Sequence, residues 1–349
     1  MTASHTSEGV PSTTATEDPA RGLRRLAIAT ALGTLLLIAM GGAVRATDSG
    51  LACPDWPACY GQWVPPADVN MWFEHSHRLW AGVIAIAVTW LTAWSAWRFR
   101  ARPVLWRLSL TALVLVLAQA ALGAAVVLLQ LQAGLVTSHL GMSLVVVACL
   151  IVLAVLARPT TEPGTPAERQ VGRWAAAVGG LVFLQALLGS QATGRGAAYV
   201  FNAVPIWLAD SAWTGHAREW LHVTHRAGGY LVAAAVVAFA VAVHRQRRRS
   251  ELPPWTGWLP WLAVGLVVLQ VGLGLANVLT RADVISAVGH LTVASWLWAT
   301  FVLAAVLGLH PRGTRPTDAH DPARVCGVRP ESTHDFSDEP NPMTEEVKA

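Results

Sequence analysis

The sequence predicts an all-α integral membrane protein in which eight transmembrane helices form two tandem, pseudo-symmetric four-helix bundles. Hydrophobic residues make up 54% of the 349 residues, charged residues make up 13%, and the mean hydropathy is +0.44. Apolar stretches of about 20 residues, the length that crosses a bilayer as a helix, recur along the chain. Motifs of the first half also return in the same order in the second half.

The expected spans are separated by short polar or arginine-rich segments. They cover residues 26–46, 74–97, 104–129, 136–157, 173–192, 219–243, 257–279 and 286–308. The chain then divides into a disordered tail (1–25), a first bundle (26–157), a linker (158–172), a second bundle (173–308) and a disordered tail (309–349). Residues 1–20 lack an apolar core, so no cleavable signal peptide is expected.

The basic residues predict the orientation in the membrane. The net charge is +4 and the pI is about 9.2, but arginines gather in alternate loops, so the charge indicates topology and no nucleic-acid partner. By the positive-inside rule both termini are cytoplasmic, in a multi-pass protein of the plasma membrane. The arginines of the cytoplasmic side are Arg21, Arg24, Arg25, Arg98, Arg100, Arg102, Arg107, Arg158, Arg169, Arg173, Arg245 and Arg247 to Arg249.

Two of the four cysteines lie together in the first outer loop. Cys53 and Cys59 stand in the segment LACPDWPACYG, on the side where an oxidising compartment permits a disulfide. A metal site is the alternative, but the loop offers no neighbouring histidine or further cysteine, which favours a disulfide. Cys149 lies within an apolar span and is expected to be a packing residue.

An internal repeat connects the two halves. Four motifs recur in order at offsets of 146 to 151 residues, and four spans separate the copies, so both halves face the same way across the membrane. Each half is then a four-helix bundle of the kind that holds cofactors between its helices. The matched motifs are Ala46-Thr47 with Ala192-Thr193, His77-Arg78 with His225-Arg226, Gln119 with Gln270, and His139 with His290.

The repeated histidines are the candidate ligands. His77, His139, His225 and His290 all lie near the outer ends of even-numbered spans, where ionisable groups are costly and indicate function. A single one could be hydrogen-bonded to a neighbouring helix, but a matched pair in each half favours paired ligands. Zinc or copper sites usually need three or four protein ligands, whereas two histidines suit the axial positions of a heme iron.

The two halves differ beside these histidines. Glu74, His77 and Arg78 stand at i, i+3 and i+4, on one helix face, and the position of Glu74 is taken by His222 in the second half. Glu74 could accept a proton or stabilise positive charge, or it could simply pair with Arg78. Arg78 and Arg226 could bind heme propionates or anchor the helix ends.

The other histidines are weaker candidates. At about 100° per residue His75 lies about 200° around the helix from His77, so it is expected to face elsewhere. His216 is expected in an outer loop without a helix to fix it. The rest lie in the tails or at cytoplasmic helix ends: His5, His244, His310, His320 and His334.

The chain resembles the heme A synthase family of bacteria and mitochondria. The likeness rests on GGAVRATDSGLACPDWPACYG (41–61) followed by Glu74-His-Ser-His77-Arg78, and on three later histidines, and it covers about residues 26–308. The family oxidises the C8 methyl group of heme O to the formyl group of heme A by successive hydroxylations, for use in cytochrome oxidase. The resemblance therefore implies an oxidoreductase with heme O as its substrate.

The resemblance also implies roles for the repeated residues. His77 and His139 would hold the substrate heme with Glu74 as the catalytic carboxylate, and His225 and His290 would hold a resident b-type heme. Which half holds which heme, and whether Glu74 acts as a base or as a cation stabiliser, stay open at this point. The implied partners are heme O synthase, cytochrome oxidase assembly factors and membrane lipid, with a homo-oligomer left open.

Two other functions compete with this interpretation. A diheme b-type electron carrier that exchanges electrons with quinol would use the same histidines without chemistry on the heme. The single-copy Glu74 and the cysteine loop argue against it. Parallel repeats also occur in transporters, but a transporter predicts no stoichiometric heme.

Overall fold

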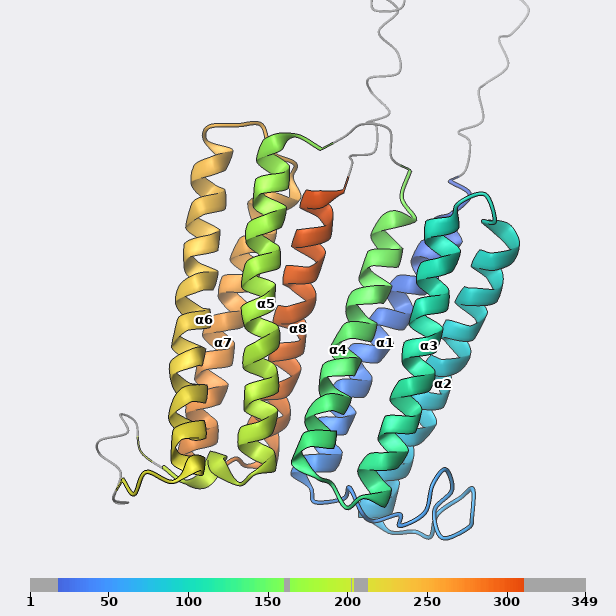
Figure 1. Cartoon of the computed structure of the whole chain (residues 1–349), viewed down its shortest axis with the longest axis vertical. Helices are drawn as coiled ribbons and strands as arrows, with labels where there is room; N and C mark the ends of the chain where they lie inside the picture. Colours follow the sequence, from blue (N-terminus) through green and yellow to red (C-terminus); the bar gives the residue numbers. More distant parts are fainter. Residues whose placement is uncertain (1–17, 160–163, 202, 204–212, 311–349) are drawn as a thin grey trace, which may run out of the picture. The chain divides into compact units, whose positions relative to one another are not determined.

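A computed structural model of the chain describes residues 18–159, 164–201, 203 and 213–310. Within these residues eight helices are long and apolar enough to cross a membrane, and there are no strands (Figure 1). The two predicted tails lie largely outside the described residues. The helices are α1 (Arg21–Ala46), α2 (Val69–Arg98), α3 (Pro103–Leu128), α4 (Ala133–Leu156), α5 (Pro166–Gly194), α6 (Ala217–Arg247), α7 (Trp255–Leu279) and α8 (Val284–Leu309), with a short 3-10 helix, η1 (Ala197–Tyr199), after α5.

Several helices extend beyond their expected apolar spans, and polar caps begin two of them, α5 and α8. Helix α5 begins at Pro166, inside the segment predicted as a linker, where Thr165 and Glu168 form a reciprocal capping box. Helix α1 begins at Arg21, inside the segment predicted as the N-terminal tail. Helix α8 is capped by Asp283, whose pKa is lowered to about 2 because hydroxyl groups of the neighbouring turn, first that of Ser286, donate to the carboxylate.

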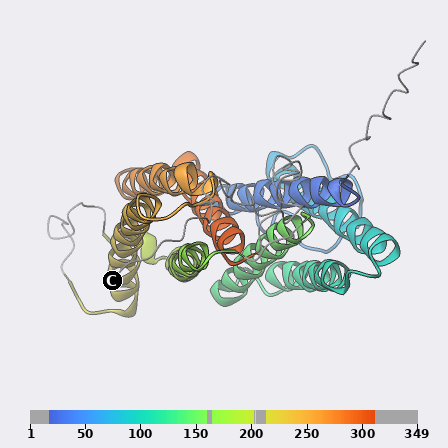
Figure 2. The same ribbon diagram turned by 90° about the horizontal axis from the view of Figure 1, so that it is seen from above.

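The helices pack in two closed rings. Helix α1 contacts α2 and α4, and α3 contacts α2 and α4; helices α5 to α8 repeat this arrangement. The rings meet where α1 and α4 contact α8 and where α4 contacts α5, and Figure 2 shows α2, α3, α6 and α7 on the outside. This is the packing expected for two four-helix bundles, while the duplication and the division into two domains stay predictions.

Each ring has its own hydrophobic core, and a third cluster joins them. Leu91 and Leu150 are fully buried in the first core, and Val236 and Phe301 are fully buried in the second. The joining cluster includes Leu144 and reaches across from α4 to α8. These cores fill the end of each ring that is remote from the cysteine loop, so the space that remains lies near the loop.

Candidate active site

A large cavity occupies the end of the helices that carries the cysteine loop, which we call the loop end. Its volume is about 1580 Å³, and residues from all eight helices line it. His77, His139, His225 and His290 all line this one cavity. The structure therefore brings the four predicted histidines to a common space between the helices.

A glycine on the preceding helix faces each of these histidines. A Cβ at any of the four positions would press on the Cε1 edge of an imidazole ring. The distances from an ideal Cβ to the histidine Cε1 are 3.1 Å for Gly41 and His77, 3.1 Å for Gly123 and His139, 2.7 Å for Gly189 and His225, and 3.1 Å for Gly274 and His290. This close approach repeats in both halves and fixes the place of each ring.

The second-half pair has a spacing that would suit two ligands of one metal ion. The ring centroids of His225 and His290 are 6.4 Å apart. A metal ion bonded to one nitrogen of each ring, at about 2 Å as in other imidazole–metal bonds, fits between rings at this separation. The Nδ1 atom of His290 is 3.1 Å from the backbone carbonyl of Gln270, and its Nε2 atom is 3.2 Å from the side-chain amide nitrogen of Gln270, a contact that a metal bound at Nε2 would replace. The donor set and spacing therefore fit a heme iron.

Glutamines position the histidine-bearing turns. The Gln185 amide lies 2.6 Å from the backbone carbonyl of His225 and 2.9 Å from its Nδ1 atom. The Gln119 amide donates to the backbone carbonyl of His139 at 2.9 Å. In the first half the Nδ1 atom of His139 is buried and has no hydrogen-bond partner among the described residues, which leaves it free to meet a ligand.

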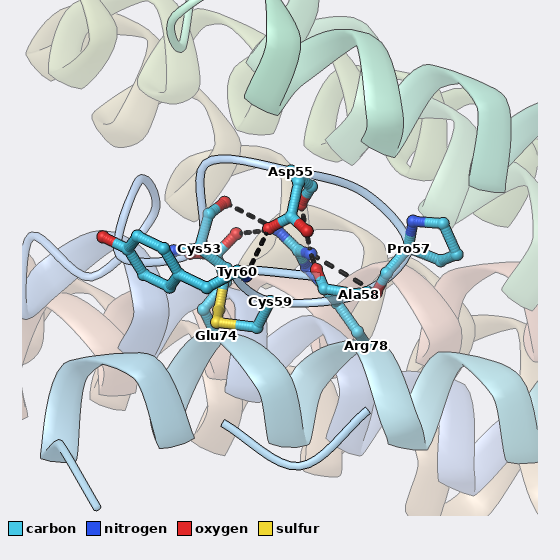
Figure 3. Close-up of polar contacts among 8 residues, drawn as sticks. All are labelled: Cys53, Asp55, Pro57, Ala58, Cys59, Tyr60, Glu74 and Arg78. Carbon is cyan, nitrogen blue, oxygen red and sulfur yellow. Dashed lines mark hydrogen bonds and ion pairs between the residues drawn. A yellow bond between two sulfur atoms is a disulfide. The ribbon is translucent and has the colours of Figure 1, made fainter. Parts of the chain in front are cut away.

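Glu74 lies at the junction of the cavity and the cysteine loop. Its side chain is only 3% exposed and lines the cavity. One carboxylate oxygen accepts a hydrogen bond from the backbone N–H of Cys53 at 2.8 Å, and the other is ion-paired with Arg78 (Figure 3). A buried carboxylate with a charged partner and a backbone donor is held in one position, which a group that acts on a bound substrate requires.

Arg78 anchors the cysteine loop onto α2. Its guanidinium donates to the backbone carbonyls of Cys53 at 3.0 Å, Asp55 at 2.7 Å and Ala58 at 2.5 Å, besides pairing with Glu74 (Figure 3). Of the two roles considered for Arg78, these contacts favour anchoring. Binding of a heme propionate stays a prediction.

The loop is also closed on itself. Cys53 and Cys59 form the predicted disulfide, and both are fully buried. Asp55 accepts hydrogen bonds from the backbone N–H groups of Gly61 at 2.7 Å and Tyr60 at 2.6 Å. These bonds, that of Gly61 first, hold the pKa of Asp55 below its usual value.

Alkylation mass spectrometry without reductant tests the disulfide in the folded protein. We expect Cys53 and Cys59 to stay unlabelled and to become labelled after denaturation and reduction, because the structure pairs them. Cys149, a free cysteine buried in the first core, serves as the control and should be labelled after denaturation alone. Labelling of both loop cysteines without reductant would refute the disulfide.

The second half repeats the anchoring with different chemistry. Arg226 donates to the backbone carbonyls of Ala203 at 2.9 Å and Phe201 at 3.2 Å, as Arg78 does in its own loop. His222, at the position matching Glu74, lies 2.6 Å from the backbone carbonyl of Ala197 through Nδ1. In the first half the Glu74 carboxylate thus accepts a hydrogen bond from a backbone N–H group. At the matching position of the second half, the His222 imidazole faces a backbone carbonyl instead.

Two sequence expectations are wrong. His75 does not face away from the site: it is 2% exposed and lines the cavity, because the wide cavity reaches around α2 beyond the face of His77. His216 is fixed by a helix, since it is the N-cap of α6 and forms a capping box with Glu219.

The facing glycines and Gln185 were missed from the sequence as site residues. Gly123 and Gly274 stand inside the repeated motif, so their recurrence four residues after a glutamine was a usable signal. Gln185 also precedes a facing glycine, Gly189, by four residues, but the first half has Leu37 in the corresponding place before Gly41. Because Leu37 breaks the series, the recurrence of a glutamine four residues before each facing glycine was not recognised from the sequence.

Comparisons with known proteins show the family of the chain. The family model described as cytochrome oxidase assembly protein (COX15-CtaA) matches residues 24–71 and 67–302. The chain is 30% identical to the heme A synthase of Shewanella oneidensis over 313 residues, which cover 77% of this chain and 91% of the relative. It is 26% identical to the heme A synthase of Bacillus licheniformis over 284 residues, 80% of this chain and 93% of the relative. It is 28% identical to the heme A synthase of Geobacillus thermodenitrificans over 315 residues, which cover 86% of this chain and 95% of the relative.

The match spans the helices that carry all four histidines, the cysteine loop and Glu74. It leaves out only the ends of the chain. The chain therefore belongs to the COX15-CtaA family of cytochrome oxidase assembly proteins.

Proposed function

We propose that this chain is a heme A synthase, an oxidoreductase that converts the C8 methyl group of heme O to the formyl group of heme A. The observation that carries the proposal is the buried Glu74 carboxylate, present only in the first half, in the cavity that His77 and His139 also line. Relatives named heme A synthase over most of the chain support the same activity. An electron carrier would not need a carboxylate in one half alone.

In this proposal the first half binds the substrate. His77 and His139 hold heme O from two helices, and the glycines opposite them leave room for the two imidazole rings. Each of two hydroxylations removes two electrons and two protons from the methyl carbon and a water molecule, the electrons passing to an external acceptor, and leaves a hydroxyl group on the carbon. The resulting geminal diol loses water to give the formyl group. Glu74 accepts a proton or stabilises positive charge at the methyl carbon, and the ion pair with Arg78 holds its carboxylate in place.

The second half supports the reaction. His225 and His290 would hold a resident b-type heme, which supplies electron transfer when bound, and their 6.4 Å centroid separation fits that group. Gln185 and Gln270 orient these two imidazoles. No carboxylate stands at the position of Glu74 in this half, since His222 takes it.

The disulfide and the arginines support the proposed orientation. The loop end would face the oxidising outer side of the plasma membrane, and the arginine-rich ends of the helices would face the cytoplasm. Both termini are then cytoplasmic. Heme O synthase, as the source of the substrate, and cytochrome oxidase assembly factors are the proposed partners.

Heme extraction tests the proposal. The full chain is expressed with a heme O synthase in cells that lack heme A, and total hemes are separated by chromatography. We expect heme A to appear only when both proteins are present. Protoheme and heme O without any heme A would favour the electron carrier, and purified protein without a Soret absorption band would favour a transporter.

A further inference from the structure

The cavity opens sideways between α2 and α3 on the outer face of the first ring. Leu79, Val83 and Ile86 line the cavity and are nevertheless 53%, 49% and 72% exposed. A side chain that borders an internal cavity and is also half exposed marks a place where that cavity reaches the lipid-facing surface. Helices α2 and α3 lie on the outside of the first ring (Figure 2), so the opening faces the hydrocarbon.

Small residues keep this opening wide. Gly82 lines the cavity, and a Cβ added there would meet no atom within 4 Å. Ala120 of α3 lines the same cavity and is exposed. The opening is therefore an apolar groove that leads from the surface to the histidine pair of the first half.

The second half carries large residues at the matching positions. In the register that aligns His77 with His225, Gly82 corresponds to Tyr230. In the register that aligns Gln119 with Gln270, Ala120 corresponds to Val271. Both larger side chains line the cavity on the side of the second half. Tyr230 and Val271 are 61% and 43% exposed, so the cavity reaches the surface in the second half too, but larger side chains border it there.

A polar group stands at the loop end of the groove. His75 is one turn before Leu79 on the same face of α2, and its Nδ1 atom is buried without a hydrogen-bond partner among the described residues. The matching residue of the second half is Val223. A buried imidazole nitrogen without a partner costs free energy unless a ligand provides one.

We propose that this groove binds the isoprenoid side chain of the substrate heme, and that His75 hydrogen-bonds the hydroxyl group that joins this chain to the porphyrin. The inference rests on the proposed function. Heme O carries a long hydrocarbon chain with a hydroxyl at its attachment point, where protoheme has a vinyl group. An apolar groove with a free imidazole nitrogen near the porphyrin matches the isoprenoid chain and hydroxyl group of heme O. It does not match the vinyl group of protoheme. The small side chains of the groove and His75 then select heme O for the first half, whereas the second half has the larger Tyr230 in place of Gly82 and the apolar Val223 in place of His75.

The test is the heme content of purified full-length chain from cells that make heme O. For Gly82→Tyr, which introduces the residue of the second half, we expect isoprenoid heme per chain to fall about tenfold, because the hydrocarbon chain loses its buried site. Protoheme per chain should stay as in the wild type. His75→Val should lower isoprenoid heme and leave protoheme unchanged. Gly265→Tyr on α7 is the matched control, since Gly265 is equally open but lies away from the cavity.

The proposal is overturned if Gly82→Tyr retains isoprenoid heme like the wild type, if it loses protoheme to the same extent, or if Gly265→Tyr has the same effect. It is also overturned if His75→Val changes nothing. A wild-type chain that retains isoprenoid heme without forming heme A would refute the proposed function and leave the groove intact. A wild-type chain that takes up no isoprenoid heme would refute both.

Discussion

Glu74→Gln is expected to abolish heme A formation while heme binding persists. Glutamine keeps the shape of the side chain and can still accept the hydrogen bond from Cys53, but it cannot accept a proton or stabilise a cation by charge. Loss of such a group lowers a rate by roughly 100-fold or more. Heme A yield from cells that also make heme O measures the activity, and the absorption spectrum of the purified variant measures heme binding.

Glu219→Gln is the matched control for this variant. Glu219 is a buried carboxylate at the loop end of α6, but it caps the helix and does not line the cavity. We expect its heme A yield to match the wild type. If the heme A yield of Glu74→Gln equals that of the wild type, Glu74 takes no part in the reaction. If the purified variant shows no heme absorption, Glu74 is needed for the structure of the site and not for the chemistry.

His77→Ala and His225→Ala are expected to remove different hemes. If the first half holds the substrate, His77→Ala loses isoprenoid heme and keeps protoheme, whereas His225→Ala loses protoheme. Both rings line the cavity and lie against glycine, so truncation removes a ligand without opening a packed core. The measurement is heme per chain after purification, separated by heme type.

His244→Ala is the control for both histidine variants. His244 lies near the other end of α6, where it contacts Trp261, and it does not line the cavity. Its heme content should equal that of the wild type. Loss of the same heme from both His77→Ala and His225→Ala would contradict two separate sites.

Hydropathy predicts the helices well because backbone polar groups in the apolar core of a bilayer must be hydrogen-bonded within the protein, and a helix satisfies them within one segment. All eight expected spans are helical in the structure. The boundaries were harder, because hydropathy follows the apolar stretch and not the helix. At Pro166 a capping box supports the polar start of the helix, and near Arg21 the ion pair of Arg24 with Asp18 lies at the start of α1.

The site was predicted where it repeats and missed where it depends on a loop or on the width of a cavity. Repetition singled out four histidines that line the cavity of the structure, while their binding of heme stays a prediction. The bonds from Arg78 to loop carbonyls depend on the path of residues 53–58, which helical periodicity does not describe. The prediction for His75 was wrong because helical periodicity gives only the angle between side chains around the helix axis. It does not say how far a cavity extends around that helix.

The most direct test of the account is the heme content of the wild-type chain purified from cells that make heme O. Two histidine pairs with different surroundings predict two chemically different hemes in each chain. We expect one protoheme and one isoprenoid heme, the latter found as heme O, its hydroxylated form or heme A. A chain that holds a single kind of heme in both sites would contradict the division between a reaction site at Glu74 and a supporting site at His225 and His290.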